Sequence, residues 1–137
     1  ISCGGAMMVR VDLFQRLGGF DPVFDPFGPE DLDFSLRLQK LGYQALYIPK
    51  ALAHHEVNHT FEGGNYTAKY AHSKARHWLR FLRRHGTLQQ KAGFLLVGVP
   101  LIPLRMTVRE LGKGNAAALW GSARGMIEAL RDSRPKS

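Results

Sequence analysis

Hydrophobic and polar positions along the chain predict short elements separated by glycines and prolines. Apolar runs at Ala6–Val9 and Tyr43–Ile48 are short enough to be strands, and Pro49 ends the second. Four other stretches carry apolar positions at helical spacing between helix start and stop residues: 12–17, 30–41, 66–85 and 116–131. The pattern therefore predicts both strands and helices.

Residues 92–104 are nearly all apolar and include Pro100 and Pro103. A helix of this length would be roughly 20 Å long, whereas the hydrocarbon core of a bilayer is about 30 Å thick. We therefore expect no upright membrane span here. Two interpretations stay open: an in-plane segment on an anionic membrane surface, flanked by Lys91 and Arg105, or an ordinary helix buried against the rest of the domain.

The composition fits one globular domain of a longer protein. The chain has 137 residues, of which 45% are hydrophobic, so it can bury a core. Cys3 is the only cysteine, which excludes a disulfide framework and a cysteine-based zinc cluster and fits a reducing compartment. Because the sequence starts at Ile1 and opens into an apolar stretch, we expect a further part of the protein upstream.

Charge is distributed unevenly between the two halves of the chain. Residues 1–62 carry five Lys or Arg against eight Asp or Glu, whereas residues 63–137 carry fourteen against three, which gives the net charge of +8. A basic block of this kind indicates an anionic partner, such as a phosphate-bearing substrate, nucleic acid or anionic lipid. A solvated charged helix face is the plain alternative.

Several short motifs in the first half become informative only when they are taken together. Glu30-Asp31-x-Asp33 alone is an ordinary helix start, and Asp33 with Arg37 is a plain i,i+4 pair. Their neighbours along the chain are Gly4-Gly5 before an apolar run, Gly18-Gly19-Phe20-Asp21, Arg37-Leu38, Gly42-Tyr43 and Pro49-x-Ala51 followed by His55. In this order and spacing, residues 2–55 resemble the C-terminal half of the catalytic domain of family 2 glycosyltransferases, closest to the rhamnosyltransferase-like members.

This resemblance implies a fold and a domain order. It implies an α/β protein in which residues 1–62 form the C-terminal half of a GT-A (Rossmann-like) catalytic domain. Residues 63–91 would be a basic helix that closes the domain. Residues 92–137 would be an apolar, mostly helical tail open to membrane association. The upstream half would carry most of the donor-binding residues.

The resemblance also implies an inverting mechanism and a set of site residues. A carboxylate acting as general base would remove the proton of the acceptor hydroxyl, and the resemblance assigns this role to Asp31 with Glu30 supporting the acceptor. It implies a divalent metal, Mg or Mn, bound mainly by the upstream half. The remaining assignments are Gly4, Gly5, Asp33 and Arg76 for substrate and His55 for the metal, with His54 as the alternative.

The expected function is sugar transfer from a nucleotide-diphosphate sugar to a glycan or lipid-linked acceptor in bacterial cell-surface polysaccharide and cell-wall synthesis. We expect a hexosyltransferase at the inner face of the cell membrane that is inactive as this isolated stretch. Alternative hypotheses are a basic nucleic-acid-binding module, disfavoured by the absence of a reader motif, and a non-catalytic membrane-surface module. His55-Glu56-Val57-Asn58-His59 matches a zinc-protease motif, but the residues before it favour extended chain rather than the helix which that motif needs.

Overall fold

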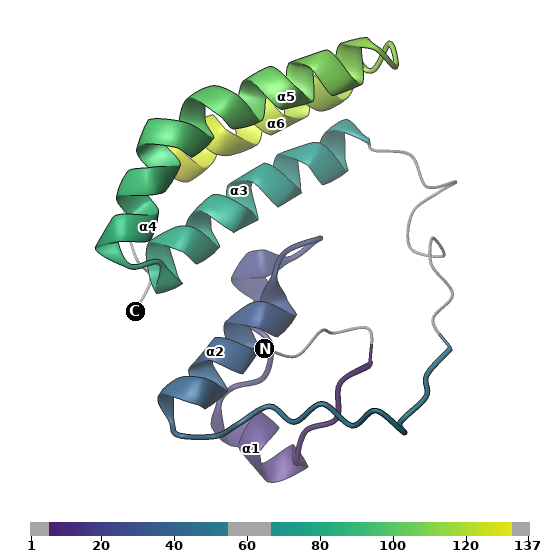
Figure 1. The fold of residues 1–137 in the computed structure, drawn as a ribbon, viewed down its shortest axis with the longest axis vertical. Coiled ribbons are helices and arrows are strands. Elements are labelled where there is room, and N and C mark those ends of the chain that lie inside the picture. The colour runs from purple at the N-terminus through teal and green to yellow at the C-terminus, as the bar shows by residue number, and fades with distance from the viewer. Residues whose placement is uncertain (1–5, 55–66, 133–137) are drawn as a thin grey trace. The chain divides into compact units, whose positions relative to one another are not determined.

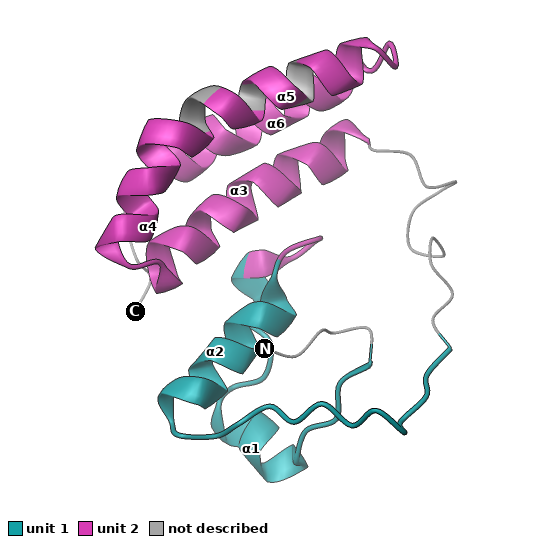
Figure 2. Ribbon diagram, viewed as in Figure 1, with its two compact units in different colours: residues 1–23, 29–65 teal, residues 24–28, 66–137 magenta. Residues whose placement is uncertain are grey.

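The structure is a computed structural model that describes residues 6–54 and 67–132, without the side chains of residues 99, 100, 103, 106 and 107. The chain forms two compact units (Figures 1 and 2). Unit 1 comprises Ile1–Val23 and Pro29–Asn65, and unit 2 comprises Phe24–Gly28 and Tyr66–Ser137. Unit 2 therefore takes five residues from a loop of the first half.

Unit 1 is built on two helices, α1 (Val11–Arg16) and α2 (Glu30–Lys40). Its buried Phe34 packs against Phe14 and Phe20, and the centroids of the three rings lie 5.2 to 5.5 Å apart in edge-to-face or tilted pairs. These are the separations at which aromatic pairs attract beyond their burial. Gly19 has φ +68°, and a Cβ there would crowd the ring of Phe14, so the turn after α1 needs glycine.

The predicted α/β, Rossmann-like fold is wrong for the part of the chain that the structure describes, which is helical and has no strand. Ala6–Val9 is mostly irregular chain, and so is Tyr43–Ile48. A strand is stabilised by hydrogen bonds to a neighbouring strand. Neither run has such a neighbour among the described residues. Their apolar side chains face solvent instead: Met8 is 99% exposed and Tyr47 is 88% exposed.

Unit 2 is centred on two parallel helices, α3 (Ala68–His85) and α6 (Ala116–Arg131). They approach so closely that a Cβ at Gly121 would overlap the carbonyl oxygen of Ala68, and one at Gly125 that of His72. The buried residues of α6 are all small: Ala118, Gly121, Ser122, Gly125 and Ala129. Main chain therefore meets main chain along this seam.

The remaining helical elements form an arm that leads from α3 back to α6. α4 (Leu88–Gly93), the π-helical turn η4 (Phe94–Gly98) and α5 (Val99–Leu111) follow one another directly. The π turn ends two residues before Pro100, and π turns are one of the usual sites at which a helix accommodates an irregularity. α5 packs on α6 and runs antiparallel to it (Figure 1). No helix within the described residues is long and apolar enough to cross a bilayer.

Candidate functional site

Two of the predicted catalytic carboxylates open helix α2. Glu30 is its first residue and Asp31 its second, after Pro29, whose side chain cannot cap the helix. Oδ1 of Asp31 accepts a hydrogen bond from the backbone N–H of Leu32 at 2.7 Å. Both side chains are partly exposed. Acidic residues stabilise a helix at this end, and here they also stay accessible to a ligand.

Asp33, the third carboxylate of this helix start, is fully buried. Its Oδ2 accepts from Nε of Arg37 at 2.8 Å, which confirms the predicted i,i+4 pair. The two terminal nitrogens of Arg37 donate to the carbonyls of Leu17 and Gly19, each at 2.7 Å. Arg37 therefore fastens α2 to the turn after α1, and Asp33 holds Arg37 in position. Binding of substrate by Asp33 stays a prediction, and this enclosed arrangement assigns Asp33 a supporting role for its neighbours on α2.

Arg76 belongs to a network of charges at the C-terminal end of α6. Its guanidinium lies 2.9 Å from Oδ2 of Asp132 and 3.8 Å from Oε2 of Glu128. Arg80 pairs with the same Asp132 carboxylate, and Arg83 donates to the carbonyls of Ala129, Leu130 and Asp132. Cations here compensate the carbonyls that a helix leaves unpaired at its end.

The same network lowers the pKa of both carboxyl groups. Hydrogen bonds from Arg76 and Arg80 lower the pKa of Asp132, and hydrogen bonds from Arg124 and His72 lower that of Glu128. His72 and Glu128 are 2.9 Å apart. The predicted role of Arg76 at a donor phosphate stays a prediction, because a phosphate would have to compete with Asp132 for the guanidinium.

His77 is a buried residue of α3 whose importance the sequence did not reveal. Its imidazole packs edge-to-face on Phe24, with the ring centroids 6.1 Å apart, and hydrogen-bonds to the backbone of Phe27. Nδ1 has no hydrogen-bond partner, and a Cβ on Gly28 would lie 3.0 Å from it. Burial, followed by the charges of Arg80 and Arg76, lowers the pKa of His77 from 6.5 to about 4. His77 is therefore the neutral anchor that holds the loop Phe24–Gly28 on α3.

Three predicted site residues, Gly4, Gly5 and His55, lie outside the described residues. His54 is exposed. Within residues 6–54 and 67–132, no group of three His, Cys, Asp or Glu side chains could hold a metal ion. The described residues thus do not form a metal site, and the metal predicted at His55 and in the upstream half stays a prediction.

The model of the family described as "Glycosyl transferase family group 2" matches residues 1–120. The chain is 33% identical over 67 residues to polypeptide N-acetylgalactosaminyltransferase 8 of Drosophila melanogaster. That match covers 49% of this chain and 11% of the relative, so the chain spans only a small part of the relative's length. No solved structure matches the chain.

Proposed function

Because this chain belongs to glycosyl transferase family group 2, we propose that the protein transfers a sugar from a nucleotide-diphosphate sugar to an acceptor hydroxyl, with inversion at the anomeric carbon. The acceptor hydroxyl is that of a glycan or a lipid-linked sugar. The observation that carries the proposal is the division among the carboxylates of α2: Asp33 is buried on Arg37, whereas Glu30 and Asp31 are partly exposed.

In the proposed reaction, Asp31 is the general base. Its carboxylate takes the proton of the acceptor hydroxyl while that oxygen attacks the anomeric carbon. The bond from the anomeric carbon to the diphosphate breaks, and the nucleoside diphosphate leaves with the electron pair. Glu30, the preceding residue of the helix, accepts a hydrogen bond from a second hydroxyl and orients the acceptor. Arg76 is the proposed contact to the donor phosphates.

The contacts of Arg37 support this assignment, because a base must be held in position to be effective. Arg37 bonds Asp33 and two carbonyls of the preceding turn, which fixes the first turn of α2 relative to α1. A site whose supporting contacts are locked keeps its reacting group in the productive geometry. Asp31 therefore sits on a rigid part of unit 1.

The basic helix α3 gives less support to nucleic-acid binding. Two of its arginines, Arg80 and Arg83, are engaged by the end of α6. A nucleic-acid surface needs cations directed at a phosphate backbone, and such binding weakens steeply with salt. Glycosyl transfer is therefore the function that we test.

The test is Asp31→Asn in the full-length protein, with the expected upstream part of the catalytic domain present. The amide keeps the shape of the side chain and cannot accept the proton, so we expect turnover to fall by about 100-fold or more with the thermal unfolding temperature unchanged. The matched control is Asp12→Asn, which changes an exposed carboxylate in the first turn of α1 that pairs with Arg10. We expect the control to keep wild-type turnover. Near wild-type turnover of Asp31→Asn would refute the assignment of the base.

A further inference from the structure

Helix α5 carries a continuous row of exposed apolar side chains. Leu101, Leu104, Val108 and Leu111 are spaced three, four and three residues apart, which places them on one helical face. Leu104 is 59% exposed and Val108 is 69% exposed. Glu110, the buried residue of α5, points away from this row by helical spacing. The row is thus an apolar face directed away from the polar, packed side of its own helix.

The exposure extends along the whole arm from α4 to α5. None of the described side chains from Leu88 to Arg109 is buried. Other large apolar residues of the arm face solvent as well: Leu88, Leu95, Leu96, Val97 and Ile102. Soluble proteins rarely leave an apolar surface of this extent uncovered, and such patches mark sites of association.

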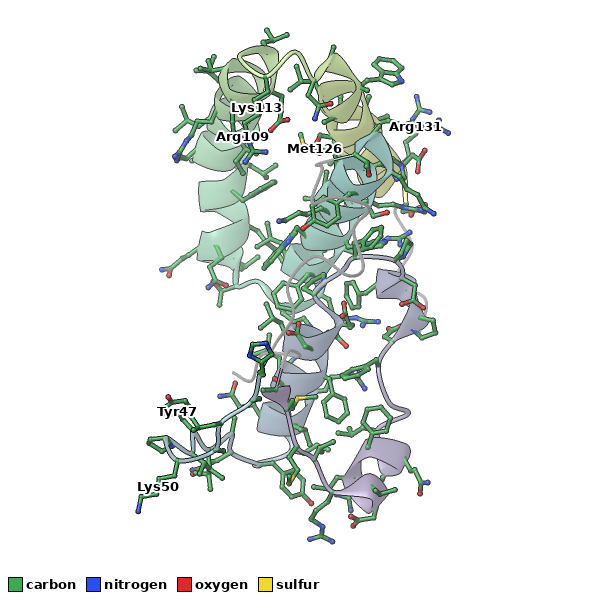
Figure 3. All side chains as sticks on the ribbon, turned by 90° about the vertical axis from the view of Figure 1, so that its right-hand side faces the viewer. Tyr47, Lys50, Arg109, Lys113, Met126 and Arg131 are labelled. Carbon is green, nitrogen blue, oxygen red and sulfur yellow. The ribbon has the colours of Figure 1, made fainter. Side chains whose placement is uncertain are left out.

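The charges around the row are all positive. Glu110 is the only acidic residue between positions 67 and 127, and it is buried, where its carboxylate accepts from Arg109 and Asn115. Lys91 lies before the row, and the exposed Arg105 and Lys113 lie beside and after it. Figure 3 shows Arg109 and Lys113 at the end of the arm that leads into α6. The arm therefore presents apolar side chains and cations, with no exposed carboxylate.

We propose that the apolar arm, residues 88–111, lies in the plane of an anionic lipid surface, with Leu101, Leu104, Val108 and Leu111 inserted at the level of the head groups. Apolar side chains with flanking cations are the features of interfacial helices. An anionic leaflet, such as the cytoplasmic face of a cell membrane, supplies the opposite charge. A second copy of the chain is disfavoured as the partner, because it would bring an equally cationic arm against the first.

This arrangement goes beyond glycosyl transfer and does not depend on it. It would hold the protein at a surface through unit 2, whichever sugar and acceptor unit 1 handles. The test therefore measures binding to lipid directly and uses no activity assay.

The primary experiment is co-sedimentation of the full chain with vesicles of phosphatidylcholine alone and of phosphatidylcholine mixed with phosphatidylglycerol. We expect binding to the mixed vesicles only. Leu104→Glu with Val108→Glu should abolish it and leave thermal unfolding unchanged, because both side chains are already exposed. The matched control is Leu46→Glu with Leu52→Glu, two exposed leucines of unit 1, which should bind as the wild type does.

A second variant separates the charge contribution from the apolar one. Arg105→Gln with Lys113→Gln should weaken binding by about 30-fold, from about 1 kcal/mol for each basic residue near an anionic surface. Arg109 is left intact in this variant because it pairs with the buried Glu110. Raising the salt concentration should reproduce the loss in the wild type.

A tryptophan placed on the row reports insertion. The chain has two tryptophans, so Leu104→Trp with Trp78→Phe and Trp120→Phe leaves one fluorophore at the proposed contact. We expect a blue shift with anionic vesicles and quenching by brominated lipid. Three results would overturn the proposal: no binding of the wild type to mixed vesicles, a wild-type dimer that Leu104→Glu with Val108→Glu dissociates, or unfolding of that variant, which would place the row in a protein core.

Discussion

Acidification should destabilise unit 2 through the buried imidazole of His77. The folded protein keeps this side chain neutral, with a pKa of about 4 instead of 6.5. Its Nδ1 has no hydrogen-bond partner and faces Gly28, so a proton added there would find no acceptor. In the unfolded chain the imidazole is hydrated and titrates near its ordinary value.

The sign and size of the effect follow from these two pKa values. Because the folded-state pKa is the lower one, the stabilisation is complete above pH 6.5 and is lost as the pH falls toward 4. Each unit of pKa difference is worth 1.36 kcal/mol, so lowering the pH from 7 to 5 should cost about 2 kcal/mol of unfolding free energy. The imidazole is 2% exposed, and solvent screening therefore does not remove the effect.

The assay is urea unfolding of the full chain at pH 7 and pH 5, followed by tryptophan fluorescence. Both tryptophans, Trp78 and Trp120, belong to unit 2, so the signal reports this unit. The perturbation is His77→Gln, which keeps a hydrogen-bond donor and does not titrate. Subtracting the pH dependence of the variant removes the contributions of groups that both proteins share, such as Glu128 and Asp132.

We expect the wild type to lose about 2 kcal/mol more than His77→Gln between the two pH values. The variant should be less stable at pH 7, because it loses the ring contact with Phe24. Parallel pH dependence of the two proteins would refute the reasoning, since it would show that His77 titrates alike in the folded and unfolded chain.

Two further predictions concern packing. Gly125→Ala should lower the unfolding free energy of unit 2, measured by urea titration, by about 1 to 3 kcal/mol, because the added Cβ would overlap the carbonyl of His72. The control is Gly93→Ala, whose added Cβ would have nothing within 4 Å, and it should be neutral or stabilising in the same titration. Arg37→Lys keeps the charge beside Asp33, but the lysine cannot reach the carbonyls of both Leu17 and Gly19. The unfolding free energy of unit 1, followed by near-ultraviolet circular dichroism, should therefore fall by about 1 to 2 kcal/mol. Unchanged stability would contradict the role of Arg37 in joining α2 to the turn after α1.

The helices were predictable because their signals are local. The last helix was predicted over 116–131, which the structure confirms, since Asn115 caps it through the N–H of Ala118 and a glycine-rich break precedes it. The helix that carries Glu30 and Asp31 was predicted for a similar reason, because the acids mark its start and Gly42, with φ +85°, follows its end.

The absence of strands from the described residues was not predictable from the two apolar runs themselves. A run such as Tyr43–Ile48 has the composition of a strand, but whether a neighbouring strand pairs with it depends on the rest of the fold. The buried face of α3 was missed for a similar reason. The buried residues of α3 are Ala71, Ser73, His77 and Leu79, whereas the larger Trp78 is 45% exposed. This face of α3 is buried because the small residues of α6 let the two helices approach closely. The contact is tertiary, so helical spacing within α3 alone does not predict it.

The loop Phe24–Gly28 has a practical consequence for dissecting this protein. Because it completes unit 2 from a position far upstream, the two units alternate along the chain, and residues 29–65 of unit 1 lie between the two parts of unit 2. If expression started just before α3, the protein would lack Phe24, and the His77 ring would lose its contact with the Phe24 ring. A single protease cut just before α3 should leave two fragments that stay associated, because Phe24 of the first fragment packs on His77 of the second.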